Sequence, residues 1–397
     1  MFRRAVWPLV LIALTCLATQ FAFSDSLSLP AYKLPPGPTA QALRSGIEAL
    51  QRGDLAAAEM SFKHVLELKP NEPHALMLLA EVALRRRMPA QTLAYLETAA
   101  SKNPTSAPAH EALGRFLATR KDYAAAEAAL KKAVELDSNW IDARLSLADF
   151  YLSQNKSDEA MATYRAAVQT DPNSAPAHYR LGMALQRTGD KQNAENELRT
   201  SARITPDSPL PHFALGDLLS RAGKDDLAIQ EYEAANEIVP TAEGYVRLGM
   251  AQERRGRTDV AVQAYQHAIL VDRDEAIAYN NLAWISAEKK QNLDDALVWA
   301  KTAVDLRPKV ASFYDTLGWV LRAKGQKNEA IATLREGTDL DPQNGELWYH
   351  LGVVYSEDGQ QRQALTAFGK ALQLNNAFPE ADDARRRLEA LKAASKP

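Results

Sequence analysis

Three similar segments in the last third of the chain carry the side chains best suited to binding chemistry. They read AYNNLAW (278–284), FYDTLGW (313–319) and LWYHLGV (347–353). Indole rings offer flat apolar surfaces, and the amide, carboxylate, phenol and imidazole groups beside them can form hydrogen bonds. This combination suits an extended peptide or a sugar chain. The candidate binding residues are Asn280, Asn281, Trp284, Asp315, Trp319, Tyr349 and His350.

Motifs of common enzyme classes do not occur in the sequence. There is no GxxxxGK[ST] loop, HExxH pair or GxSxG elbow, so the chemistry of those classes is not indicated. Six of the seven histidines fall at recurring positions of a repeat, which explains them better than metal ligation does. We therefore expect a protein that is not an enzyme and that has no metal site and no cofactor.

The elements that position these residues are copies of one unit, which returns about every 34 residues between residues 39 and 378, ten times in all. If Gly46 is position 8, that position is always Gly or Ala, position 20 is Ala or Thr, position 24 is usually large and apolar, and position 32 is usually Pro. We expect positions 8 and 20 to form one close helix crossing and position 24 to fill the space between repeats. The position 8 residues are Gly46, Ala80, Gly114, Ala148, Gly182, Gly216, Gly249, Ala283, Gly318 and Gly352.

Leu-Gly, an aromatic, Ala, Phe or Tyr, Ala and Pro at these offsets resemble the tetratricopeptide repeat. The resemblance covers residues 39–378. It implies an all-α fold, namely an α-solenoid in which about ten helix-turn-helix repeats form a right-handed superhelix. It also implies that the first helix of each pair lines a concave groove where partners bind.

The segment 379–397 and two irregular steps complete the predicted array. Ala381, Ala384, Leu388 and Leu391 recur at helical spacing, which predicts a capping helix over the last repeat. The step from Pro240 to Gly249 is one residue short and that from Ala283 to Ala296 one residue long, and we expect turns to absorb both. The pairs Asp225-Asp226 and Asp294-Asp295 fall between predicted helices, where we expect aspartate to act as an N-cap.

Residues 1–24 have the pattern of a cleaved secretory signal peptide. Arg3 and Arg4 precede an apolar run that ends at the small residues of Ala22-Phe23-Ser24. We expect a periplasmic or secreted protein, with residues 25–38 as a Pro-rich linker. One alternative is an inner-membrane anchor through residues 5–23. Another is lipidation at Cys16, although the preceding Ala-Leu-Thr fits a lipoprotein box poorly.

The overall charge argues against nucleic acid as a partner. The formal net charge is −3 and becomes −5 when Arg3 and Arg4 are removed with the signal, so no general basic field exists. The groove-lining positions of the first seven repeats nevertheless carry an excess of arginines. This excess suits either an acidic partner or an ordinary solvated helix face. The arginines concerned are Arg85, Arg115, Arg180, Arg187, Arg221, Arg247 and Arg254.

The expected function is a non-enzymatic protein–protein interaction scaffold. It would hold peptide segments of an envelope, secretion or polysaccharide-assembly system in its groove. The segment DTLGWVL (315–321) looks similar to exported tetratricopeptide arrays of bacterial exopolysaccharide systems. Two alternatives remain: a carbohydrate-binding module that uses the aromatic groove, and a regulatory subunit of a separate glycosyltransferase.

Overall fold

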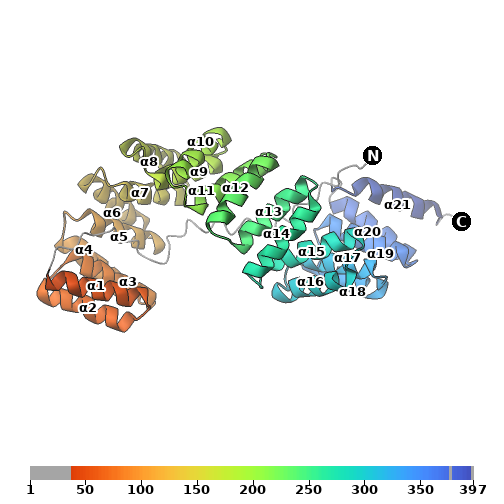
Figure 1. Cartoon of the computed structure of the whole chain (residues 1–397), viewed down its shortest axis with the longest axis horizontal. Helices are drawn as coiled ribbons and strands as arrows, with labels where there is room; N and C mark the ends of the chain where they lie inside the picture. The colour runs from red at the N-terminus through yellow and green to blue at the C-terminus, as the bar shows by residue number, and fades with distance from the viewer. Residues whose placement is uncertain (1–36, 375–377, 395–397) are drawn as a thin grey trace. The chain divides into compact units, whose positions relative to one another are not determined.

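Helices make up nearly all of the residues that the structure describes. The computed structural model describes residues 37–374 and 378–394, which contain twenty-one α-helices and no strand (Figure 1). They fall into two units, divided between residues 206 and 207. The N-terminal unit contains α1 Pro38–Gln51, α2 Leu55–Leu68, α3 Pro73–Arg85, α4 Pro89–Lys102, α5 Ala107–Thr119, α6 Tyr123–Leu136, α7 Ile141–Ser153, α8 Ser157–Thr170, α9 Ala175–Thr188 and α10 Lys191–Ile204. The C-terminal unit contains α11 Pro209–Arg221, α12 Asp225–Ile238, α13 Ala242–Arg254, α14 Thr258–Val271, α15 Ala276–Lys289, α16 Leu293–Leu306, α17 Ala311–Ala323, α18 Lys327–Leu340, α19 Gly345–Glu357, α20 Gln361–Leu374 and α21 Ala381–Ala394.

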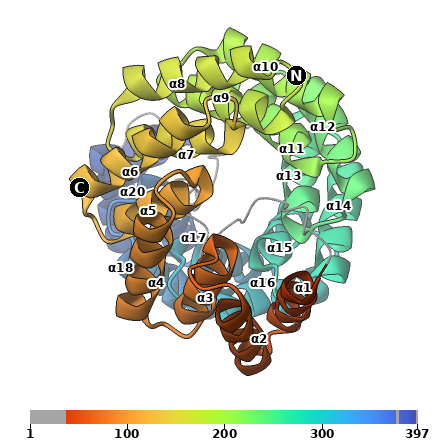
Figure 2. The same ribbon diagram turned by 90° about the vertical axis from the view of Figure 1, so that its left-hand side faces the viewer.

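Consecutive helices pair into ten hairpins, from α1 with α2 to α19 with α20. Within each unit every hairpin packs on the next, as Figures 1 and 2 show. Each hairpin matches one copy of the sequence repeat, and α21 follows the last one. The all-α helical-repeat fold predicted from the sequence is therefore confirmed.

At the close helix crossing, position 8 meets the position 24 side chain of the same repeat, and at Gly114 it also meets the backbone oxygen of Ala126, the position 20 residue. A Cβ atom built on Gly182 would lie 2.8 Å from Cγ of Leu198, and one built on Gly216 would lie 2.4 Å from Cε1 of Tyr232. The position 24 side chain thus lies over the glycine of its own hairpin. It also packs against the next repeat, as predicted: Tyr232 shares a buried cluster with Leu248 and Ala251. The position 20 residues are fully buried: Ala58, Thr92, Ala126, Ala160, Ala194, Ala228, Ala261, Ala296, Ala330 and Ala364.

Replacing Gly182 with alanine tests this crossing. The added methyl group would meet both the Leu198 side chain and, at 3.2 Å, its backbone nitrogen, so the helices must separate. We expect Gly182→Ala to lower the free energy of unfolding by about 1–2 kcal/mol, since overpacking outweighs the helix propensity of alanine. Urea denaturation followed by circular dichroism measures the change.

Gly369 provides the matched control for Gly182. It lies within α20 and has no atom within 4 Å of a built Cβ. Gly369→Ala should therefore be neutral or stabilise the protein by up to about 1 kcal/mol. Equal effects of the two substitutions would contradict the crossing described here.

Aspartates begin several second helices, but not those predicted. The side chains of Asp54, Asp122 and Asp190 accept hydrogen bonds from backbone N–H groups in the first turns of α2, α6 and α10. The predicted caps are wrong, because Asp225-Asp226 and Asp294-Asp295 lie inside the first turns of α12 and α16. There they face the positive end of the helix dipole. They also reach the next repeat: Asp225 pairs with Arg254 and Asp294 with Lys324.

Turns absorb both irregular steps, as predicted. The longer step places Lys290 and Asn292 between α15 and α16, both left-handed with φ of 51° and 50°. The shorter step leaves α12 and α13 joined through residues 239–241, where the Thr241 hydroxyl accepts a hydrogen bond from the Gly244 N–H at 3.0 Å. The helices themselves keep their usual lengths.

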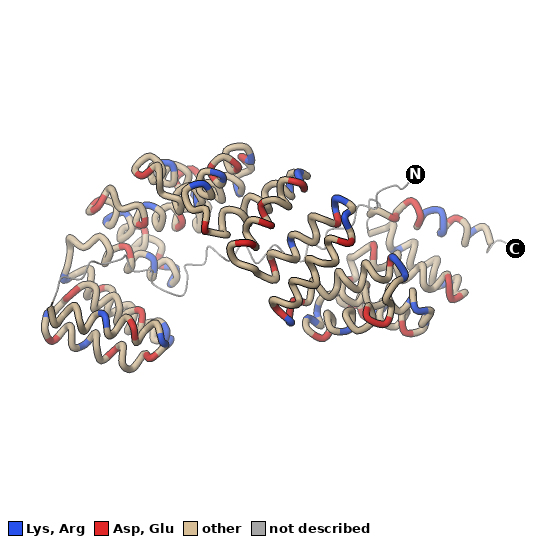
Figure 3. The backbone as a smooth tube through the Cα atoms, viewed as in Figure 1, with Lys and Arg blue, Asp and Glu red and all other residues tan. Residues whose placement is uncertain are grey.

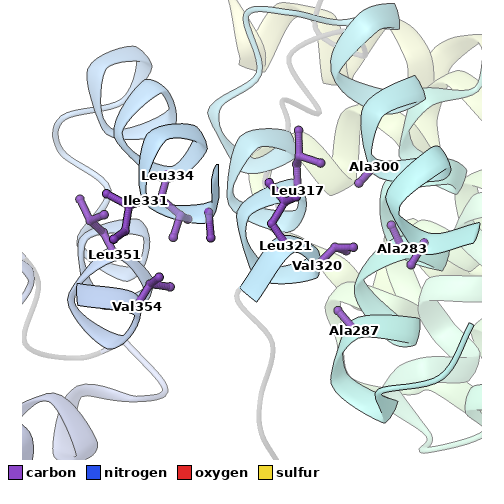
Figure 4. Packing of buried hydrophobic residues seen from close by; sticks show 12 residues of the cluster. Ala283, Ala287, Ala300, Leu317, Val320, Leu321, Ile331, Leu334, Leu351 and Val354 are labelled. Carbon is purple, nitrogen blue, oxygen red and sulfur yellow. The ribbon is translucent and has the colours of Figure 1, made fainter. Parts of the chain in front are cut away.

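Small and branched apolar side chains fill the core of the last repeats. Figure 4 shows Leu317, Val320 and Leu321 of α17 on the side of Ala283 and Ala300, which belong to the preceding hairpin. At the C-terminal end, Ala381 and Ala384 of α21 are buried in the cluster that contains Phe368, while Leu388 and Leu391 are partly buried there. The helix α21 therefore covers the end of the array with the predicted face.

The predicted signal peptide (1–24), nearly all of the predicted linker (25–38), the alternative anchor (5–23) and Cys16 lie outside the described residues. The helix α1 begins at Pro38, the last residue assigned to the linker. Among the helices in residues 37–374 and 378–394, none is both long and apolar enough to cross a membrane.

Candidate functional site

The candidate residues lie on three first helices of consecutive repeats, α15, α17 and α19. These helices pack side by side, α15 on α17 and α17 on α19. Residues at equivalent positions of the repeat therefore come close together even though they are about 34 residues apart in sequence. All of the geometry below belongs to the C-terminal unit.

Two tryptophans form the centre of this surface. The rings of Trp284 and Trp319 are stacked, with centroids 6.0 Å apart and planes inclined by 10°. The imidazole of His350 packs against both, with centroid distances of 5.7 Å and 4.4 Å. The register of the repeats thus places the two indoles together as predicted, and it adds a histidine ring from the third helix.

Charged groups of the protein hold Trp319 in place. The guanidinium of Arg322 lies 4.2 Å from the ring centroid, a cation–π contact, and its Nε donates a hydrogen bond to Glu357 at 2.9 Å. The indole Nε1 donates to Oε1 of Glu288 at 2.6 Å. Together with Trp284 and His350, these groups occupy much of the Trp319 ring. Little of its surface is left for stacking on a sugar.

His350 is a buried histidine paired with a carboxylate. Its exposed fraction is 3%, and its Nδ1 lies 2.8 Å from Oδ1 of Asp315. Burial acts to lower the pKa of His350, but the charge and hydrogen bond of Asp315 outweigh burial, so the pKa is raised. Asp315 therefore stabilises the charged form of the imidazole beside the two indoles.

Two further carboxyl groups, Glu346 and Glu380, act on His350 and were not among the predicted site residues. Burial raises the pKa of Glu346 to about 8, against the opposing effect of His350. Burial also raises the pKa of Glu380, which directly precedes α21. Glu346 occupies position 2, a groove-lining position of the repeat, so the repeat pattern could have identified it. Glu380 lies beyond the last repeat, so the repeat pattern does not predict its location.

The remaining candidates occupy the edges of the cluster. Tyr349 packs against His350 at 5.4 Å, but its hydroxyl donates to Asp383 of α21 at 2.9 Å, so it ties the capping helix to the last repeat. Asn280 and Asn281 form a separate pair, with Asn280 Nδ2 donating to Asn281 Oδ1 at 3.2 Å. The structure thus brings Trp284, Asp315, Trp319 and His350 into one cluster and leaves the asparagines beside it.

Most of the arginines noted in the earlier repeats form ion pairs within the protein. Arg180 pairs with Asp149 of the preceding repeat, and Arg247 pairs with Glu243 at 2.6 Å. Acidic and basic residues are interspersed along the helices of both units in Figure 3. Similar pairs are Arg85 with Glu81, Arg115 with Glu111 and Arg254 with Asp225. These arginines serve the array itself, which removes most of the reason to expect an acidic partner there.

Two histidines outside the cluster lie against the turns between repeats. Nε2 of His110 lies 3.2 Å from the carbonyl oxygen of Pro104, and Nε2 of His178 lies 3.0 Å from that of Pro172. Tyr314 and Trp348, at the same repeat position, donate to the carbonyls of Pro308 and Pro342. No group of three potential metal ligands gathers within the described residues.

Comparisons with known proteins agree with this architecture. Family models described as "Tetratricopeptide repeat" match residues 49–116, 117–181, 158–212, 246–311 and 345–378, and one described as "TPR repeat" matches 318–359. No curated protein matches the sequence.

Among solved structures, similar chains include the MamA protein and YrrB, described as a TPR protein with an unusual peptide-binding site. MamA is 27% identical, with 43% of this chain and 93% of that chain covered and a TM-score of 0.39. YrrB is 21% identical, with 49% and 97% covered and a TM-score of 0.39. A tetratricopeptide repeat protein from Parabacteroides merdae is 14% identical, with 64% and 98% covered and a TM-score of 0.49. The repeated family matches and the ten helical hairpins together show that this chain belongs to the tetratricopeptide repeat family of protein–protein interaction scaffolds.

Proposed function

We propose that this protein is an exported, non-enzymatic scaffold that holds an extended peptide segment against the first helices of its last three repeats. The observation that carries the proposal is the cluster of Trp284, Trp319 and His350, with Asp315 beside it. In the other repeats, by contrast, many inner charges form pairs within the array.

Export is proposed from the sequence of residues 1–24, and it places the partner in the periplasm or outside the cell. The partner would then belong to an envelope, secretion or polysaccharide-assembly system. Fractionation of cells that produce the full chain, with mass spectrometry of its N-terminus, tests this step. A cytoplasmic chain that keeps residues 1–24 would contradict export.

Partner capture tests the site itself. We expect the double substitution Trp284→Ala with Trp319→Ala to abolish capture of protein partners from an envelope extract, because it removes both indoles of the cluster. Trp299→Ala is the matched control, since Trp299 lies on the second helix α16 and is also partly buried. The control protein should capture the same partners as the unchanged protein.

Glycan binding is the contrasting result of the same experiment. If the double variant keeps its protein partners but loses binding to purified envelope polysaccharide, the protein is a carbohydrate-binding module and the peptide proposal is wrong. The occupied faces of Trp319 favour the peptide outcome, because Arg322 and His350 already lie against the ring.

A further inference from the structure

We propose that the inner face formed by α17, α19 and Glu380 binds a lysine or arginine side chain of the partner segment. This inference rests on the proposed function and names the chemistry of what the groove accepts. It concerns acidic groups that the sequence did not single out. The arginines of the earlier repeats suggested an acidic partner, whereas this inference names a basic side chain of the partner.

The first observation is an imbalance of charge. Asp315, Glu346 and Glu380 all act on one cation of the protein, the imidazole of His350. A carboxyl of Glu288, which accepts the indole hydrogen bond of Trp319, also acts on Glu380. Three carboxyl groups therefore act on one buried imidazole, and Glu288 acts on one of the three, Glu380. A further positive charge at this place would be stabilised by those carboxyl groups that are ionised.

The equivalent places in two earlier repeats do not show this imbalance. Position 6 of the repeat is Arg180 in α9 and Arg247 in α13, and each pairs with an aspartate of the preceding repeat, Asp149 or Asp217. In α19 the same position is His350, a shorter side chain with a single charge that depends on pH. The last repeat thus lacks the fixed cation that α9 and α13 carry at this position.

The second observation is a set of hydrogen-bonding atoms without partners on α15, on α17 and at the residue before α21. Oδ1 of Asn280, Oγ of Ser312 and Oε2 of Glu380 are buried and have no hydrogen-bond partner among the described residues. Asn280 is only 3% exposed, and it lies one helical turn before Trp284, so both occupy one face of α15. Asp315 occupies the same position of the next repeat, and its carboxylate contacts Nδ1 of His350 on α19. Unpaired buried acceptors favour a ligand that brings N–H donors.

A bound cation changes the protonation of this site. Because the pKa of Glu346 is about 8, this group is mostly protonated at pH 7 in the free protein. An ammonium or guanidinium beside it would lower that pKa and expel the proton. The groups that determine the response are Asp315, His350 and Glu380. Binding should therefore release protons near pH 7 and strengthen as the pH rises toward 8.

Fluorescence anisotropy with a labelled hexalysine peptide tests the inference on the full chain at about 150 mM salt, where long-range attraction is screened. We expect hexalysine to bind, and hexaglutamate and a glycine-serine peptide not to bind. The double variant Glu346→Gln with Glu380→Gln should weaken binding at least about tenfold, as loss of charge-assisted hydrogen bonds implies. The matched control is Glu336→Gln with Glu389→Gln, which makes the same two substitutions at exposed positions of α18 and α21.

Calorimetry in two buffers of different ionisation enthalpy measures the number of protons released on binding. Non-specific electrostatic attraction of hexalysine to the surface would not produce this release. Hexalysine binding at pH 7 should release protons, and Glu346→Gln should reduce that release. Equal weakening by the inner and the exposed pair of substitutions, or binding without proton release, would overturn the inference.

The two proposals fail in different ways. In one case, the Trp284 and Trp319 double variant loses its protein partners, but the substitutions at Glu346 and Glu380 leave hexalysine binding unchanged. The groove then binds peptides, and the proposed cation subsite is wrong. If hexalysine binds as described but no partner protein depends on the two indoles, the cation subsite stands and the proposed scaffold function of this groove is wrong.

Discussion

Raising the pH from about 5.5 to 8.5 should destabilise the last repeat and α21 by on the order of 4 kcal/mol. The main cause is Glu346, whose pKa rises from 4.5 to about 8 on folding because it is buried. Between these values the folded state binds more protons than the unfolded state, so stability falls as the pH rises. The raised pKa values of Glu380 and His350 act in the same direction.

Hydrogen exchange of the α19 and α21 amides measures this change, after correction for the intrinsic exchange rate at each pH. Glu346→Gln keeps the neutral form of the side chain, so it should flatten the dependence and protect these helices at pH 8.5. Burial also raises the pKa of Glu253 in α13 to about 7, which gives that repeat a smaller dependence of the same sign. Equal protection at both pH values in the unchanged protein would contradict this account of the cluster.

Replacing Leu198 with alanine should destabilise the N-terminal unit by about 3 kcal/mol. Leu198 is fully buried over Gly182, which has no side chain to fill the space that Leu198 leaves. Loss of a fully buried leucine side chain removes apolar burial and leaves a cavity, which together cost about 2–5 kcal/mol. Urea denaturation measures the effect, and Leu210→Ala, at a position 58% exposed, should change little.

Adding Gly182→Ala to Leu198→Ala should recover part of that loss. The alanine methyl group, which clashes with leucine, would enter the cavity that the leucine leaves. The chain already contains such a pair, since Ala283 and Ala300 occupy positions 8 and 24 of the eighth repeat and both are fully buried. We expect the double variant to be at least about 1 kcal/mol more stable than the sum of the single effects predicts. Strict additivity would mean that the two positions do not share one space.

The fold could be predicted because its determinants are local and repeated. Gly or Ala at position 8 indicates a helix crossing within each repeat, and proline at position 32 indicates the end of a helix. Ten copies make the pattern unmistakable. The detailed contact could not be predicted, because sequence spacing shows which positions share a helix face but not which side chain lies over the glycine. The register alone did not reveal that the side chain of Leu198 lies directly over Gly182.

The site shows the same division. The register placed Trp284 and Trp319 together, because position 9 of neighbouring first helices repeats at a constant offset. It did not show that Arg322 and His350 would occupy the ring of Trp319, nor that Tyr349 would turn its hydroxyl to Asp383 of α21. Side-chain direction and partners depend on the packing of three helices, which a repeat pattern does not describe.

The sequence by itself determined the family of fold, the length of the array and the helices that carry the candidate residues, since these follow from periodicity within and between copies. Only the tertiary structure decided which charges are neutralised. Arg180 and Arg247 are paired within the array, whereas Asp315, Glu346 and Glu380 share His350. The reason is physical: ionisation depends on burial and on distances between atoms far apart in the chain, and folding alone creates both.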